Sequence, residues 1–128
     1  MRTIIAGSRN IVDMSELEAA LCSCGWSPSV VLCGMAKGPD TLGRHWALSH
    51  KIPVEEYPAQ WRLANGSIDR GAGIKRNCLM GDSADALLAL WEGSSHGTQH
   101  MIRYAKQKGL HVFVRIVQPR DFSIFDFC

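Results

Sequence analysis

Five short apolar runs recur along the chain, at residues 3–6, 30–33, 54–57, 86–91 and 111–116. Four of them are nearly continuous in β-branched and aliphatic residues, and the run at 54–57 is the weakest. Strands that are buried on both faces, as in a parallel sheet, have this unbroken pattern. The pattern therefore predicts five strands.

Amphipathic segments between these runs predict four helices. Asp13 is a candidate N-cap of the first helix and Gly25 a stop, the second follows Pro39, the third is short, and Gly109 ends the fourth. The apolar residues at helical spacing are Met14, Leu17, Leu21 and Cys24, then Leu42, Trp46 and Ala47, then Ile74, Cys78 and Leu79, and last Met101, Ile102 and Ala105.

Alternation of strands and helices predicts an α/β fold, a Rossmann-like doubly wound parallel sheet with strand order 3-2-1-4-5 and helices on both faces. We assign residues 1–117 to this domain. Residues 118–128 form a tail that carries three phenylalanines. Because free phenylalanines favour aggregation, we expect the tail to pack on the domain or to form the interface of a homo-oligomer.

Composition narrows the class of protein. The chain has 128 residues, of which 46% are hydrophobic and 20% charged, and a formal net charge of +2. The basic residues are scattered, which argues against nucleic acid as a partner. No secretory or membrane-spanning pattern is visible, and the odd number of cysteines suggests buried free thiols, so we expect a cytoplasmic protein. His96 and His100 have metal-ligand spacing without a third ligand, and we expect neither a metal nor a cofactor.

Residues that follow the predicted strands are the candidates for ligand binding, because open α/β sheets bind ligands beyond the carboxyl ends of their strands. Gly7, Ser8 and Arg9 follow the first strand and suit a phosphate. The second strand is followed by a segment whose candidate residues are Gly34, Lys37, Gly38 and Asp40. Its backbone N–H groups could hold an anion, and Asp40 is either a plain helix cap or an acceptor for a ribose hydroxyl.

The loop after the fourth strand is the strongest local signal. It leads directly into a helix, and its candidates are Trp91, Glu92, Gly93, Ser94, Gly97 and Thr98. Small residues allow close approach of a ligand, and a helix N-terminus favours an anion. In the predicted strand order this loop and the one after the first strand flank the switch point.

A second group of candidates surrounds the start of the third helix. Lys75, Arg76 and Asn77 stand where basic residues are otherwise disfavoured, which favours an anionic ligand over a plain solvated helix start. Trp61 and Trp91 either stack on a base or pack. The segment from residue 60 to 73 is long and aperiodic, and is either a lid over the ligand or a surface connection.

Taken in order, these motifs resemble the YspA-like branch of the SLOG superfamily, a group of Rossmann-like nucleotide-binding domains. The matching segments are residues 6–9, 34–40, 57–61, 72–77 and 91–98. The resemblance implies binding of nucleotides or their derivatives, such as ADP-ribose-like, NAD-derived or cyclic molecules, in stress or conflict settings that include those between phage and bacterium.

The chain departs from the phosphoribohydrolase relatives in that superfamily. Their motif ends in a catalytic glutamate, and Met101 stands in its place here. This favours binding or sensing over catalysis. The alternative is a hydrolase that cleaves an N-glycosidic or phosphate bond, with Glu92 as its acid or base. Single-stranded nucleic acid binding is the third and least favoured hypothesis.

Overall fold

The computed structural model describes residues 1–34, 39–60 and 62–118. Their five strands form one sheet in which all pairs are parallel, in the order β3-β2-β1-β4-β5. The strands are β1 (Arg2–Gly7), β2 (Val30–Cys33), β3 (Val54–Glu56), β4 (Ala86–Trp91) and β5 (His111–Ile116). The predicted Rossmann-like strand order is therefore confirmed.

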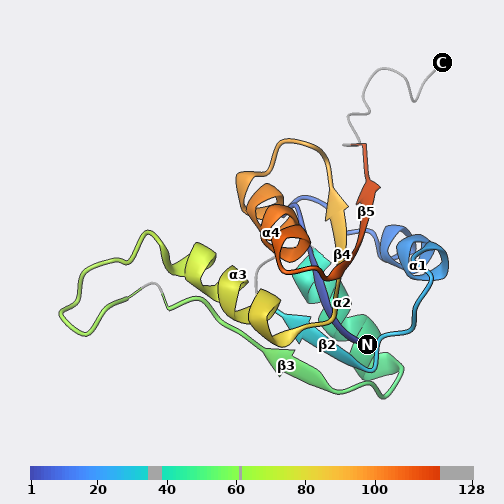
Figure 1. Ribbon diagram of the computed structural model, residues 1–128, viewed down its shortest axis with the longest axis horizontal. Coiled ribbons are helices and arrows are strands. Elements are labelled where there is room, and N and C mark those ends of the chain that lie inside the picture. Colours follow the sequence, from blue (N-terminus) through green and yellow to red (C-terminus); the bar gives the residue numbers. More distant parts are fainter. Residues whose placement is uncertain (35–38, 61, 119–128) are drawn as a thin grey trace.

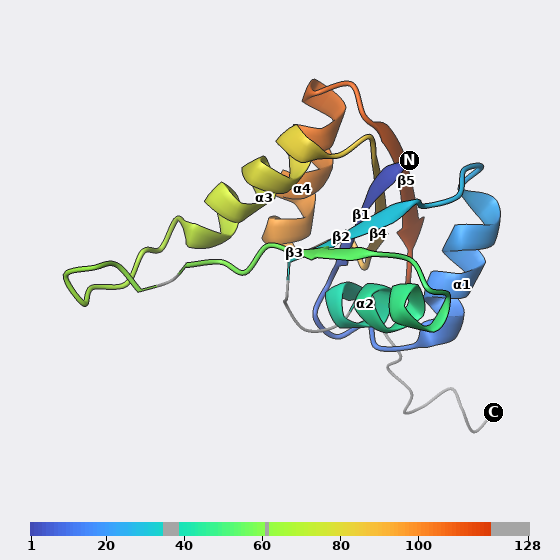
Figure 2. The ribbon, with the colours of Figure 1, turned by 90° about the horizontal axis from the view of Figure 1, so that it is seen from below.

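Among the described residues, four helices cover the sheet, two on each face. They are α1 (Met14–Ser23), α2 (Pro39–Ser49), α3 (Ala72–Ser83) and α4 (His96–Gln107). Figure 1 labels these elements, and Figure 2 shows α3 and α4 on one side of the strands and α1 and α2 on the other. This arrangement buries both faces of the central strands, which explains their unbroken apolar sequence.

Each face of the sheet has its own core, because successive residues of β1 point to opposite sides. Ile4 packs with Met80 and Met101 beneath α3 and α4. Ile5 packs with Leu17 and Ala47 beneath α1 and α2. Strand β1 therefore lies at the centre of the molecule, and the residues that follow it emerge between the two layers of helices.

Local signals placed most helix ends correctly. Asp13 caps α1 by accepting a hydrogen bond from the backbone N–H of Ser15 at 3.0 Å. Gly25 and Gly109, which follow α1 and α4, have φ values of 92° and 76° that favour glycine.

The third helix differs from its prediction in both length and orientation. It is twelve residues long rather than short. Ile74 and Leu79, expected on its buried face, are 53% and 59% exposed. Asn77, Met80 and Gly81 are buried instead, because the helix turns Met80 into the core and packs against Tyr104 of α4 at Gly81, a position that an apolar pattern does not reveal. The prediction of buried free cysteines was also partly wrong, because Cys22 is exposed.

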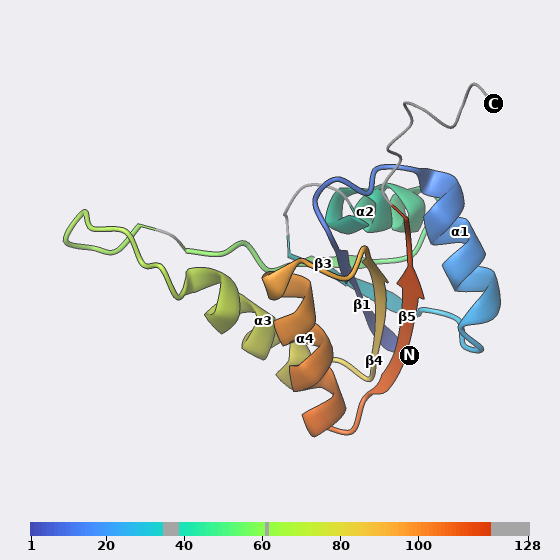
Figure 3. The ribbon, with the colours of Figure 1, turned by 90° about the horizontal axis from the view of Figure 1, so that it is seen from above.

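The long segment before α3 forms an arm, residues 62–71, that projects away from the sheet (Figure 3). An isolated bridge joins Arg62 to Ile68, and Gly66 turns the chain with a φ of 87°. Asn65 Oδ1 accepts hydrogen bonds from the N–H and hydroxyl of Ser67 at 3.0 and 2.6 Å. The tip is therefore an ordered turn that points outward, and only the base of the arm lies near the sheet.

The predicted tail lies outside the described residues except for Gln118. Within the described part of the chain, no helix combines the length and apolar character that crossing a membrane requires. The same part brings together no group of three metal-ligating side chains.

Candidate functional site

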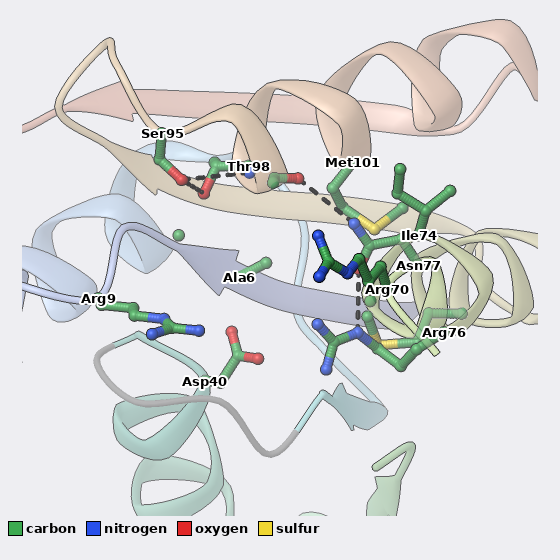
Figure 4. A pocket seen from close by; sticks show the side chains of 14 residues that line it. Ala6, Arg9, Asp40, Arg70, Ile74, Arg76, Asn77, Ser95, Thr98 and Met101 are labelled. Atoms are coloured by element: carbon green, nitrogen blue, oxygen red, sulfur yellow. Dashed lines mark hydrogen bonds between the residues drawn. The ribbon is translucent and has the colours of Figure 1, made fainter. Parts of the chain in front are cut away.

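A pocket of about 320 Å³ lies beyond the carboxyl ends of β1 and β4, where the strand order reverses. It is bounded by the loop after β1 and by the starts of α2, α3 and α4 (Figure 4). The lining residues are Ala6, Gly7, Arg9, Asp40, Arg70, Gly73, Ile74, Arg76, Asn77, Met80, Ser95, Gly97, Thr98 and Met101. Position and polarity make it the candidate binding site.

Gly7 is the residue that lets β1 pass this close to β4. A Cβ at this position would lie 2.0 Å from the carbonyl oxygen of Leu90. The backbone N–H of Ser8 donates to the same oxygen at 3.0 Å. The loop after β1 is therefore held against the end of β4, and any larger residue at position 7 would separate them.

Arg76 is fixed in the pocket by two neutral acceptors. Its Nη1 donates to the carbonyl oxygen of Gly34, and its Nε donates to Asn77 Oδ1 at 3.0 Å. A Cβ on Gly34 would lie 2.8 Å from both Arg76 Nη1 and Asp40 Oδ2. Glycine at position 34 thus leaves room for both charged side chains beside its backbone.

Asn77 links α3 to the first turn of α4. It is 6% exposed, and its Nδ2 donates to the carbonyl oxygen of Gly97 at 3.3 Å. Nδ2 also lies 3.4 Å from His100 Nδ1. This link positions the beginning of α4 beside Arg76, so the helix N-terminus and the guanidinium face the same pocket (Figure 4).

Arg9 and Arg70 are the unpartnered cations of the pocket. Both are exposed, and among the described residues neither makes a hydrogen bond or an ion pair. Arg70 lies at the base of the arm, directly before α3. With Arg76, they give the pocket three guanidinium groups against one lining carboxylate, that of Asp40. Such a set of donors suits a phosphate or another anion.

Several predicted residues support the site without lining this pocket. Ser8 is buried, and its hydroxyl donates to Glu92 Oε1 at 2.7 Å. The backbone N–H groups of Ser94 and Ser95 donate to the same oxygen at 3.2 and 2.9 Å. Glu92 thus occupies the turn after β4, where these N–H groups would otherwise be free to hold a ligand.

Hydrogen bonding, chiefly from the Ser8 hydroxyl, lowers the pKa of Glu92. Its side chain lines a separate groove of about 910 Å³ between α1 and β5 rather than the central pocket. A low pKa disfavours the protonated form that a general acid needs at neutral pH. The arrangement indicates that Glu92 holds the loop in shape.

Other candidates are also turned away from the pocket. Lys75 pairs with Asp69 at 2.7 Å, on the side of α3 that faces the arm. The indole of Trp91 packs at the edge of the core and its Nε1 donates to the carbonyl oxygen of Ser95 at 3.2 Å. Gly93 is exposed with a φ of 103°, so its role is to shape the turn. Lys37, Gly38 and Trp61 lie outside the described residues.

Comparison with known proteins shows the family of this chain. The model of the YspA, cpYpsA-related SLOG family matches residues 1–63. Gene 61 protein of Mycobacterium phage D29 is 32% identical over 120 residues, covering 87% of this chain and 93% of that protein. The chain belongs to the YspA, cpYpsA-related SLOG family. No solved structure is significantly similar to it.

Membership of this SLOG family indicates a role connected with nucleotides, either in binding or in a related activity. The matched residues supply Ala6, Gly7, Arg9 and Asp40 to the pocket, and the other lining residues come from α3, α4 and the residues just before them. Met101 stands at the position where the similar phosphoribohydrolases have a glutamate. It lies in the wall of this pocket and is 1% exposed.

Sequence reasoning missed Arg70 and Ser95. Arg70 is a basic residue beside the start of the third helix, and a basic residue at that helix start is the signal that drew attention to Lys75. Ser95 is the N-cap of α4, and its hydroxyl accepts from the N–H of Thr98 at 3.4 Å. An N-cap search with the correct helix start would have found it.

Proposed function

We propose that this protein binds or senses a nucleotide-derived phosphorylated ligand in the pocket between β1 and β4. The observation that carries the proposal is the pair of unpartnered guanidinium groups, Arg9 and Arg70, that line the pocket together with the fixed Arg76. Arginines that line one pocket without acidic partners among the described residues favour anions that neutralise them.

The start of α4 adds further donors for that anion. Gly97 is the second residue of the helix, and its backbone N–H has no partner among the described residues. A Cβ on Gly97 would meet nothing within 4 Å, so the backbone here is open to an approaching ligand. The partial positive charge of a helix N-terminus stabilises phosphate in this position.

Size and chemistry fit a nucleotide fragment. A volume of about 320 Å³ lies at the lower end of small-molecule sites. Ile74, Met80 and Met101 supply apolar surface beside the arginines, so one ligand can meet both an ionic and an apolar surface. ADP-ribose-like, NAD-derived and cyclic nucleotides all have this character. Similarity to a phage protein is consistent with a role in conflict between phage and bacterium.

The experiment is calorimetric titration with ADP-ribose, NAD, cyclic AMP and AMP, after native mass spectrometry to find any compound that co-purifies. We expect at least one compound to bind, and Arg9→Ala or Arg70→Ala to weaken it by about tenfold or more. Arg103→Ala is the matched control, because Arg103 is exposed on α4 and lines none of the three pockets described.

Failure would take one of two forms. If Arg103→Ala weakens binding as much as Arg70→Ala, the effect comes from net charge and the site is elsewhere. If no nucleotide binds and none co-purifies, the nucleotide assignment fails. Conversion of a bound compound into products would favour the enzyme alternative, and Asp40, the one carboxylate among the described lining residues, would be the group to test first.

A further inference from the structure

The arginines of the pocket fall into two sets that lie on opposite sides of it. Figure 4 shows Arg9 on one side and Arg70 and Arg76 on the other, with the carboxylate of Asp40 between Arg9 and Arg76. The sets also come from different elements, the loop after β1 and the beginning of α3. The pocket therefore has two separate positions for an anion.

The first position combines Arg9 with the start of α4. The Ser8 hydroxyl, next to Arg9 in the chain, donates to Glu92 and ties the two loops together. In Figure 4, Ser95 and Thr98 lie on the same side as Arg9. A phosphate here would meet a guanidinium and the hydroxyls and N–H groups of the helix start.

The second position combines Arg70 and Arg76 with Asn77. Since Arg76 is already held by Gly34 and Asn77, its guanidinium is presented to the pocket without the loss of side-chain freedom that a mobile arginine would suffer on binding. Arg70 has no partner among the described residues and is free to close on the same anion. This position requires nothing from the Arg9 side.

Asp40 is the reason that one phosphate does not serve both sets. It is 5% exposed and held at the start of α2. A single phosphate placed midway between Arg9 and Arg76 would lie against this carboxylate, and like charges repel. An uncharged group that offers hydroxyls, such as a sugar, suits that place because carboxylate oxygens accept from hydroxyl donors.

We infer that the ligand carries two phosphate groups on opposite sides of a sugar, one for each set of arginines. This inference rests on the proposed function and narrows it to a class of ligand. It distinguishes a nucleoside bisphosphate, or another compound with separated phosphates, from a nucleotide whose phosphates form one chain at one end of the sugar.

The test compares three adenosine compounds by calorimetry at one salt concentration. AMP has one phosphate, ADP has two in a chain, and adenosine 3′,5′-bisphosphate has two on opposite sides of the ribose. We expect the bisphosphate to bind at least about tenfold more tightly than ADP, although both carry two phosphates. Arg9→Ala and Arg70→Ala should each weaken the bisphosphate by about tenfold, with Arg103→Ala unchanged.

AMP is the compound that separates the two sets. With one phosphate it occupies one position, so only one of the two variants, Arg9→Ala or Arg70→Ala, should weaken it. The inference is overturned, and the proposed function survives, if ADP binds as tightly as the bisphosphate or if both variants weaken AMP equally. If none of the three compounds binds, while ADP-ribose or NAD does, the inference fails alone; if no nucleotide binds at all, both fail.

Discussion

Glu92 offers the sharpest test of how the site is built, because the structure gives it a supporting role, whereas the alternative hydrolase hypothesis from the sequence made it the acid or base. Its Oε1 accepts from the Ser8 hydroxyl, the Ser95 N–H and the Ser94 N–H. Glu92→Ala removes all three hydrogen bonds and leaves the loop before α4 joined to the loop after β1 through backbone donors, from the N–H of residue 92 to Ser8 Oγ at 3.3 Å and from the Ser8 N–H to the carbonyl oxygen of Leu90 at 3.0 Å. Both the stability of the fold and the shape of the pocket should therefore change.

The magnitude depends on which donors water can reach afterwards. Ser8 is 2% exposed, so its hydroxyl loses a charged acceptor that water does not easily replace, whereas Ser94 is exposed. A hydrogen bond to a charged group is worth about 1.5–3 kcal/mol, and solvent discounts the remaining two. We expect Glu92→Ala to cost about 2–3 kcal/mol, which lowers the Tm by roughly 6–12 °C in a domain of this size.

Glu92→Gln should cost about 1 kcal/mol, because the amide oxygen still accepts these hydrogen bonds but neutral ones are about half as strong. Chemical denaturation at pH 7 measures all of these differences. Glu18→Ala and Glu18→Gln are the controls, since Glu18 is exposed on α1 and has no partner among the described residues.

The pH dependence has a definite sign. The folded-state pKa of Glu92 lies below its ordinary value of 4.5, so its stabilisation is fully present above that pH and is lost as the pH falls through the folded-state pKa. The gap between the natural chain and Glu92→Gln should therefore shrink as the pH is lowered from 6 towards 3. Equal unfolding midpoints for Glu92→Ala and Glu18→Ala would refute this reasoning. A product-forming activity abolished by Glu92→Gln would instead restore the catalytic role.

Three further predictions concern single positions and the tail. Gly97→Leu should abolish nucleotide binding with little change in Tm, since a Cβ there meets nothing within 4 Å; a stable variant that still binds contradicts the position of the pocket. Gly43→Ala should lower the free energy of unfolding by about 1–2 kcal/mol although alanine favours helix more than glycine, because the added Cβ would lie 2.8 Å from Ile5 Cβ and Cγ2. Chemical denaturation measures this difference, with Gly97→Ala as the control. If the tail forms an interface, we propose that a chain ending at Pro119 forms an assembly of fewer copies, measured by its mass in light scattering. If the tail packs on its own domain, that chain should have a lower Tm. Unchanged mass and Tm would contradict both.

The sequence determined the fold class because the alternation of apolar strands and amphipathic helices is a local pattern that repeats along the chain. Runs such as residues 86–91 and 111–116 predicted β4 and β5 with their observed bounds, since strands covered on both faces need unbroken apolar sequence. Asp13, Gly25 and Gly109 marked helix ends through their own backbone chemistry. Glycine-rich loops after β1 and β4 then predicted a binding site between them, and the strand order brings these two loops together.

Only the tertiary structure decided which side chains face the pocket. Lys75 and Arg70 carry the same charge and lie within three residues of the start of α3. Yet Lys75 forms an ion pair with Asp69 on the far side from the pocket, whereas Arg70 has no partner among the described residues. Glu92 turns into its own loop because the buried Ser8 hydroxyl and two N–H groups hold it there. Ile74 and Leu79 are exposed because α3 packs through Gly81 against Tyr104 of α4. In each case contacts made in the folded chain set the direction of the side chain, and the pattern of apolar and polar residues along the chain does not contain that information.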